Sequence, residues 1–167
     1  MQNFIFYTGS GKKIKFNEMI KEIYSFINEK NGNYRIMIGT DSEIENNFVD
    51  FVSAVVVYRV GFGARFFYRR WKKNLKIYEI KSKNSVFFIN QRIWEEVTSS
   101  LDLAKNLINN FKENNLLINF ELHVDVGYNG KARDIIQELI NYIRGYGLEV
   151  KIKPNSFAAS KVADRFF

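Results

Sequence analysis

The sequence predicts an α/β fold in which a mixed sheet of five strands carries helices on both faces. Its first half holds long β-branched and aromatic runs separated by short turns, which is typical of an antiparallel meander. Its second half alternates apolar strand-like runs with segments of helical period, which is typical of parallel crossovers. No linker, internal repeat or low-complexity segment divides the 167 residues, so we expect one domain over 1–167.

The meander follows an N-terminal extension over 1–33. Within this extension an amphipathic helix is expected over 17–30, because apolar residues recur on one stripe and Asn31-Gly32 is a helix stop signal. The three strands that follow are expected over 35–41, 48–60 and 62–71. Gly61 between the last two predicts a hairpin.

The second half begins after a polar, basic stretch over 72–85, which predicts a loop. The later elements are, in order, a long helix from 86 or 90 to 111, a strand over 116–126, a helix over 131–144, a strand over 148–152 and, after the single proline, a helix over 156–166. Short connections and right-handed crossovers favour the spatial strand order third, second, first, fourth, fifth. This is the ribonuclease H-like architecture, with an extra helix in front.

Composition restricts the chemistry. The formal net charge of +7 and the pI near 9.5 favour a polyanionic partner such as nucleic acid. Because the chain has no cysteine and only one histidine, thiolate and multi-histidine metal sites are excluded. An oxygen-liganded hard cation is therefore the expected metal. No secretory leader or membrane span is evident, so we expect a cytoplasmic protein without membrane contact.

Three aspartates occupy suggestive positions. Asp41 and Asp125 each close an apolar strand-like run, and Asp164 lies in the last helix. The predicted strand order brings Asp41 and Asp125 together. Crowded carboxylates repel one another, and a divalent cation reverses that cost. The pattern therefore indicates a metal site.

A fourth acid is expected from the long helix, where Glu95 and Glu96 compete. At about 100° per residue, Glu95 points almost directly away from the apolar stripe and should face water. Glu96 lies on the flank of the stripe, from which it can reach the strand ends. The geometry favours Glu96.

Three motifs give the chain a family resemblance. They are Ile-Gly-Thr-Asp-Ser at 38–42, Val-Asp-Val-Gly-Tyr-Asn-Gly-Lys at 124–131 and Lys-Pro-Asn-Ser-Phe-Ala-Ala-Ser-Lys-Val-Ala-Asp-Arg at 153–165. In these motifs the chain resembles the YkuK-type family of predicted ribonuclease H-related nucleases. The resemblance implies a ribonuclease H-like fold and two Mg²⁺ or Mn²⁺ ions held by four acids. The matching acids are Asp41, Glu96, Asp125 and Asp164.

The resemblance also implies hydrolysis of phosphodiester bonds in nucleic acid. Two ions about 4 Å apart grip the scissile phosphate, activate a water and stabilise the leaving oxygen. Asp41 would be the bridging ligand. RNA, DNA and hybrid substrates, internal and terminal cleavage, and the oligomeric state all stay open. Two other classes compete, namely a nucleic-acid-binding module without catalysis and a protein-interaction domain with structural carboxylates.

Each acid also has a structural explanation. Asp41 and Asp125 suit turns at strand ends, and Asp164 suits a solvated helix position paired with Lys161 or Arg165. Asp41-Ser42-Glu43 has the Asp-x-Glu spacing of proofreading exonucleases. Since no Tyr or His lies a few residues before Asp164, we expect Glu43 to be an exposed acid instead.

Basic and aromatic residues suggest where a substrate would bind. Arg69, Arg70, Trp71, Lys72 and Lys73 combine charges for phosphates with a ring for stacking on bases. A charged strand edge that prevents aggregation explains this run equally well. Lys131, Lys161 and Arg165 lie near the motifs and are further candidates for phosphate contacts. His123 is expected to be a packed strand residue rather than a ligand.

Overall fold

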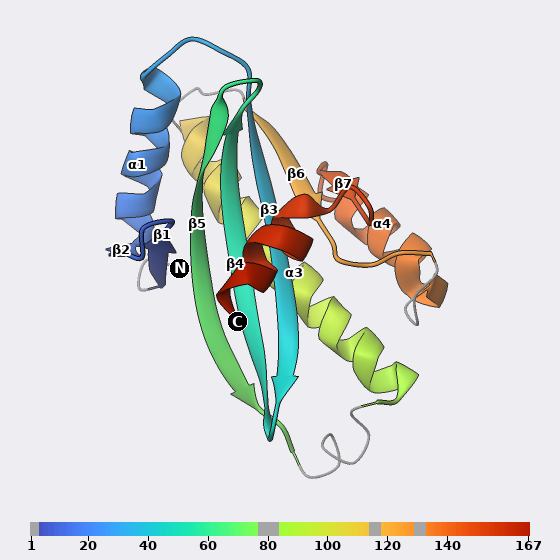
Figure 1. Cartoon of the computed structure of the whole chain (residues 1–167). Helices are drawn as coiled ribbons and strands as arrows, with labels where there is room; N and C mark the ends of the chain where they lie inside the picture. The colour runs from blue at the N-terminus through green and yellow to red at the C-terminus, as the bar shows by residue number, and fades with distance from the viewer. Residues whose placement is uncertain (1–3, 77–83, 114–117, 129–132) are drawn as a thin grey trace.

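The structure is a computed structural model of the chain, and it describes residues 4–76, 84–113, 118–128 and 133–167. Its centre is a mixed sheet of seven strands in the order β2-β1-β5-β4-β3-β6-β7 (Figure 1). The strands are β1 (Ile5–Thr8), β2 (Lys13–Lys15), β3 (Tyr34–Glu45), β4 (Phe48–Arg59), β5 (Gly63–Asn74), β6 (Asn119–His123) and β7 (Glu149–Lys151). The predicted mixed α/β fold is confirmed.

The predicted count of five strands is wrong, and so is the predicted order for the sheet as a whole. Two short strands from the N-terminal extension, β1 and β2, continue the sheet beyond β5. β1 pairs antiparallel with β5 through Tyr7 and Thr8. The five predicted strands lie next to one another as β5-β4-β3-β6-β7. The extension is therefore part of the sheet as well as the source of a helix.

The meander consists of three long antiparallel strands. β3 and β4 pair from Tyr34↔Arg59 to Glu45↔Phe48, and β4 and β5 pair from Phe48↔Asn74 to Arg59↔Gly63. The second connection contains Gly61 at φ 81°, a left-handed conformation that glycine adopts without steric cost. β3 and β5 both run past their predicted ends, because their polar continuations still find partners on β4.

Three helices cover one face of the sheet. They are α1 (Phe16–Asn28), α3 (Val86–Glu113) and α4 (Ile136–Arg144), the last preceded by one 3₁₀ turn, η1 (Arg133–Ile135). Alternate strand residues such as Ile36, Ile38 and Val55 join the apolar sides of these helices in one buried core. The apolar periods used to predict the helices are thus explained by burial. Within the described ranges, no helix is long and apolar enough to cross a membrane.

The C-terminal segment covers the opposite face, where Figure 1 shows it in red across β3 and β4. It forms a π-helical turn, η2 (Ala158–Ala163), followed by a 3₁₀ turn, η3 (Asp164–Phe166), instead of the regular helix expected over 156–166. Ala158 packs with Met37 and Val56, and Ala163 packs with Val52 and Ala54. Small residues at both places let the segment lie close to the sheet.

Candidate metal centre

The register of two parallel strands brings Asp41 and Asp125 together. β3 and β6 are neighbours, and their last paired residues are Gly39 and His123. Asp41 lies two residues beyond Gly39, and Asp125 lies two residues beyond His123. The two aspartates therefore occupy matching positions at the carboxyl end of the β3–β6 pair, as the predicted strand order requires.

Glu96 reaches this place from α3. Its side chain is only 4% exposed, and it accepts a hydrogen bond from the hydroxyl of Ser42 on β3. Arg92, one helical turn earlier, donates to the same hydroxyl at 3.0 Å and also to the backbone carbonyl of Ser42. The neighbouring Glu95 lies elsewhere and pairs with Lys73 at 2.6 Å. The choice of Glu96 over Glu95 agrees with this placement.

Asp164 comes to the site with the C-terminal segment, which is held at both ends. At its start, the backbone N–H of Ala158 donates to Nδ1 of His123 at 3.0 Å. Nδ1 is therefore an acceptor, and Nε2 carries the proton that it donates to Glu121, 3.2 Å away. Burial lowers the pKa of His123, which keeps the ring neutral. His123 is a packed strand residue, as expected.

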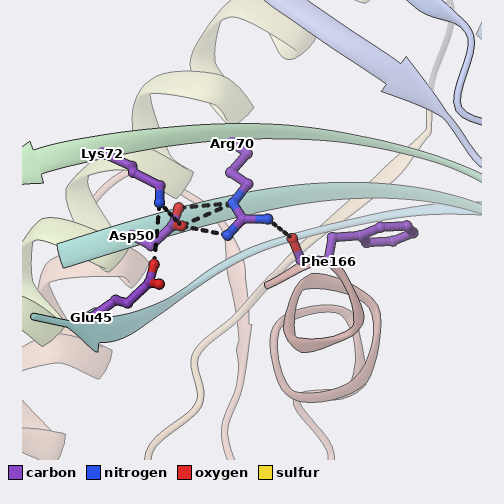
Figure 2. Close-up of polar contacts among 5 residues, drawn as sticks. All are labelled: Glu45, Asp50, Arg70, Lys72 and Phe166. Atoms are coloured by element: carbon purple, nitrogen blue, oxygen red, sulfur yellow. Dashed lines mark hydrogen bonds and ion pairs between the residues drawn. The ribbon is translucent and has the colours of Figure 1, made fainter. Parts of the chain in front are cut away.

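At its end, the segment is held by Arg70 of β5. Figure 2 shows Arg70 donating to the backbone carbonyl of Phe166 at 3.0 Å while its guanidinium binds both carboxylate oxygens of Asp50. The Phe166 ring stacks on Tyr68 with 3.8 Å between ring centroids. These contacts fix the turn that carries Asp164 on the face of the sheet.

The acids of the site influence one another electrostatically. Burial raises the pKa of Asp41 to about 6, and the charges of Asp125 and Asp164 raise it further. Burial also raises the pKa of Glu96 to about 8, with the charge of Asp41 next and a smaller contribution from Asp125. Asp41 is thus the acid that couples to the other three, which is the relationship expected of a bridging ligand.

Two basic residues of this cluster were missed at the level of sequence. Nζ of Lys153 lies 2.8 Å from Oδ2 of Asp125, and Arg92 contributes to both raised pKa values by lowering them. The four-residue spacing of Arg92 and Glu96 puts both on one side of α3 and is a signal that could have been used. Lys153 gave no such signal, because its partner comes from a distant strand.

The side chains present fit a hard divalent cation in kind. Their ligand atoms are carboxylate oxygens, and Oδ1 of Asp125 is buried with no hydrogen-bond partner among the described residues. Within those same residues, no three His, Cys, Asp or Glu side chains converge closely enough to hold a metal ion as they stand. Lys153 and Ser42 account for part of this, since each occupies an oxygen of one of the acids.

The basic run at 69–73 is engaged within the protein. Arg69 lies over the rings of Phe4 and Trp71, with 4.0 and 4.2 Å to their centroids. Trp71 stacks on Phe51, and Lys72 contacts Asp50 and Glu45. These contacts fit the interpretation of a charged, structured strand better than that of an open phosphate-binding surface.

The other candidate substrate contacts are placed less closely. Lys161 and Arg165 are exposed and belong to the segment that carries Asp164. Lys131 lies outside the described residues. Glu43 is exposed on β3, two residues beyond Asp41, as expected of an acid that takes no part in the cluster.

Comparison with known proteins agrees with the fold and the strand ends. The model of the Ribonuclease H-like family matches residues 18–167, and the chain belongs to this family. The chain is also 28% identical over 171 residues to an uncharacterised protein, YkuK, of Bacillus subtilis (strain 168). That match covers 98% of this chain and 97% of the relative, and it confirms the YkuK-type resemblance. No solved structure matches.

Proposed function

We propose that this protein is a divalent-metal-dependent nuclease that hydrolyses phosphodiester bonds of nucleic acid by a two-metal mechanism. The observation that carries the proposal is the mutual coupling of four acids at the carboxyl end of β3 and β6. Asp41 is coupled to Glu96, Asp125 and Asp164, and two of the four have strongly raised pKa values. Perturbed acids that crowd at strand ends are typical of functional sites.

The cost of this crowding has a chemical remedy. Ionised Asp41 and Glu96 are disfavoured by burial and by each other, and hard cations reverse both effects. Asp41 would be shared between two ions, with Glu96, Asp125 and Asp164 completing their ligands. When bound, Mg²⁺ or Mn²⁺ would supply Lewis-acid polarisation of the phosphate and a water of lowered pKa. The acids hold and orient; no histidine base is needed.

Nucleic acid as the substrate class is supported by two facts. The Ribonuclease H-like family suggests it, and the net charge of +7 favours a polyanion. Exposed Lys161 and Arg165 on the C-terminal segment are the described cations best placed to contact phosphates beside the acids. With Arg70 and Lys72 paired to Asp50, the run at 69–73 contributes less than its composition suggests.

The test is cleavage by the purified protein with Mn²⁺, using single-stranded, duplex, hybrid and junction substrates. Asp41→Asn should abolish cleavage, because it removes the acid coupled to the other three. Glu43→Gln is the matched control, since Glu43 is an exposed acid two residues away on the same strand. A second matched pair is Glu96→Gln against Glu95→Gln. Equal cleavage by the wild type and Asp41→Asn would disprove the proposal.

A nucleic-acid-binding module without catalysis is the second candidate. The observation that favours it is that no three metal-ligand side chains of the described residues are arranged to hold an ion. Salt-sensitive binding of an oligonucleotide, without Mn²⁺ binding and without cleavage, would support this candidate over the nuclease.

A further inference from the structure

Lys153 lies directly beside the segment that carries Asp125. It follows β7, and its backbone N–H donates to the carbonyl of Val126 at 2.9 Å. A Cβ placed on Gly127 would lie 3.3 Å from Cβ of Lys153, so the two backbones are in close contact. The backbone therefore fixes the base of the Lys153 side chain next to the acid cluster.

The ammonium of Lys153 is the cation in contact with Asp125. Its Nζ lies 2.8 Å from Oδ2 of Asp125, whose side chain is only 18% exposed, whereas 52% of the Lys153 side chain is exposed. The hydrogen bond with Asp125 raises the pKa of Lys153, and the charges of Asp41 and Glu96 raise it further. Lys153 thus neutralises part of the cluster from its solvent side.

This arrangement cannot persist unchanged if a divalent cation binds Asp125. The ammonium and the metal ion would compete for the same oxygen, and their like charges repel at short range. Lysine has a flexible stem of four carbons and a compact charge, so it can move without disturbing the backbone. Its exposure gives it room to do so.

We propose that Lys153 is an exchangeable internal cation, which neutralises Asp125 in the metal-free protein and contacts a substrate phosphate once metal has taken its place. This inference rests on the proposed function. It assigns Lys153 two effects of opposite direction: it weakens metal binding, and it strengthens the binding of nucleic acid when metal is present.

The first experiment measures Mn²⁺ affinity by calorimetry without nucleic acid. Lys153→Met should bind Mn²⁺ about five-fold more tightly than the wild type, the change expected when one partly exposed ion pair no longer competes. Lys151→Met is the matched control, because Lys151 lies two residues away and pairs with Glu149 instead. It should leave Mn²⁺ affinity unchanged. Lys153→Gln removes the same charge and should behave like Lys153→Met.

The second experiment measures binding of a single-stranded oligonucleotide by fluorescence anisotropy with saturating Mn²⁺, under conditions in which a gel shows no cleavage. Lys153→Met should lower the slope of log affinity against log salt by about one, the change expected for one lost phosphate contact. Lys151→Met should keep the wild-type slope.

The outcomes separate the two proposals. Unchanged or weaker Mn²⁺ binding by Lys153→Met and Lys153→Gln would overturn the role of Lys153 while the metal-dependent function stands. An unchanged salt slope would overturn its phosphate contact. Absence of Mn²⁺ binding by the wild type and by both Lys153 variants would overturn the inference together with the proposed function.

Discussion

The hydroxyl of Ser42 donates a hydrogen bond to the carboxylate of Glu96, although 54 residues separate them in the sequence. This contact joins β3 to α3 directly beside Asp41, and the Ser42 backbone N–H donates to Oδ1 of Asp41 at 2.8 Å. One residue therefore touches two of the four acids. The position of Ser42 after Asp41 is part of the site and not only a turn signal.

Replacing Ser42 by alanine should raise the pKa of Glu96 above its value of about 8. The hydrogen bond from Ser42 stabilises the ionised form and lowers this pKa, so its loss acts in the opposite direction. A pH titration of the Glu96 carboxyl by NMR measures the change. Ser100→Ala is the control, because Ser100 is a buried serine of α3 that bonds Thr40 and no acid. A lower Glu96 pKa in Ser42→Ala would contradict the prediction.

The metal-free protein should lose stability as the pH rises from about 4.5 to about 8. Between these values Glu96 is ionised in the unfolded chain but protonated in the folded one, so folding binds a proton that a higher pH withdraws. Asp41 acts in the same direction up to about pH 6. Chemical denaturation at pH 5, 6, 7 and 8 after chelation measures the slope.

Glu96→Gln should flatten this dependence, because the glutamine cannot ionise. The expected gain over the wild type at pH 8 is on the order of a few kcal/mol of unfolding free energy. Glu95→Gln is the control and should retain the wild-type slope. A pH dependence that is the same in all three proteins would show that Glu96 is not the group responsible.

Arg70→Met should destabilise the fold by about 3 kcal/mol, since it leaves the Asp50 carboxylate buried with a weaker partner. Asp50 is 1% exposed, and Arg70 also holds the carbonyl of Phe166 (Figure 2). Urea denaturation measures the loss. Lys72→Met is the matched control, because Lys72 contacts the same carboxylate at 3.4 Å and should cost less. Equal costs would refute the central role of Arg70.

Lowering the pH should loosen the C-terminal segment through His123. A protonated ring has no acceptor at Nδ1, so the N–H of Ala158 would lose its partner. The folded-state pKa of His123 is lowered, so its contribution to stability is present above about pH 6.5 and is lost as the pH falls below that value.

Amide hydrogen exchange of Ala158, followed by NMR against pH and corrected for intrinsic exchange, measures this effect. His123→Phe should reduce the protection of Ala158 and cost about 1–3 kcal/mol, because a buried N–H is left without a partner. In that variant the protection should no longer depend on pH between 5 and 7. A pH dependence that survives the substitution would assign the effect to another group.

Sequence patterns predicted the elements whose stability comes from their own periodicity. The long helix and the three meander strands belong to this class, and parallel pairing of β3 with β6 follows from crossover geometry. The short strands β1 and β2 do not. Their runs of four and three residues carry little pattern, and β1 becomes a strand by pairing with Tyr68 and its neighbour on β5.

The same distinction applies to the candidate site. Asp41, Asp125 and Glu96 were accessible because strand ends and helix faces can be read from periodicity. Lys153 and the two anchors of the C-terminal segment, His123 and Arg70, depend on contacts between distant elements. Ion pairs of that kind leave no spacing in the sequence from which they could be predicted.

The pairing of Gly39 with His123 has a consequence for divergence within the family. Asp41 and Asp125 are each two residues beyond this pair, so their separation is determined by the hydrogen bonds of the sheet and not by the long stretch of chain between them. Insertions and deletions in that stretch can accumulate without moving the two carboxylates. A shift of β6 along β3 by one residue would separate them, and we expect natural variants to change loop lengths freely but to keep this register.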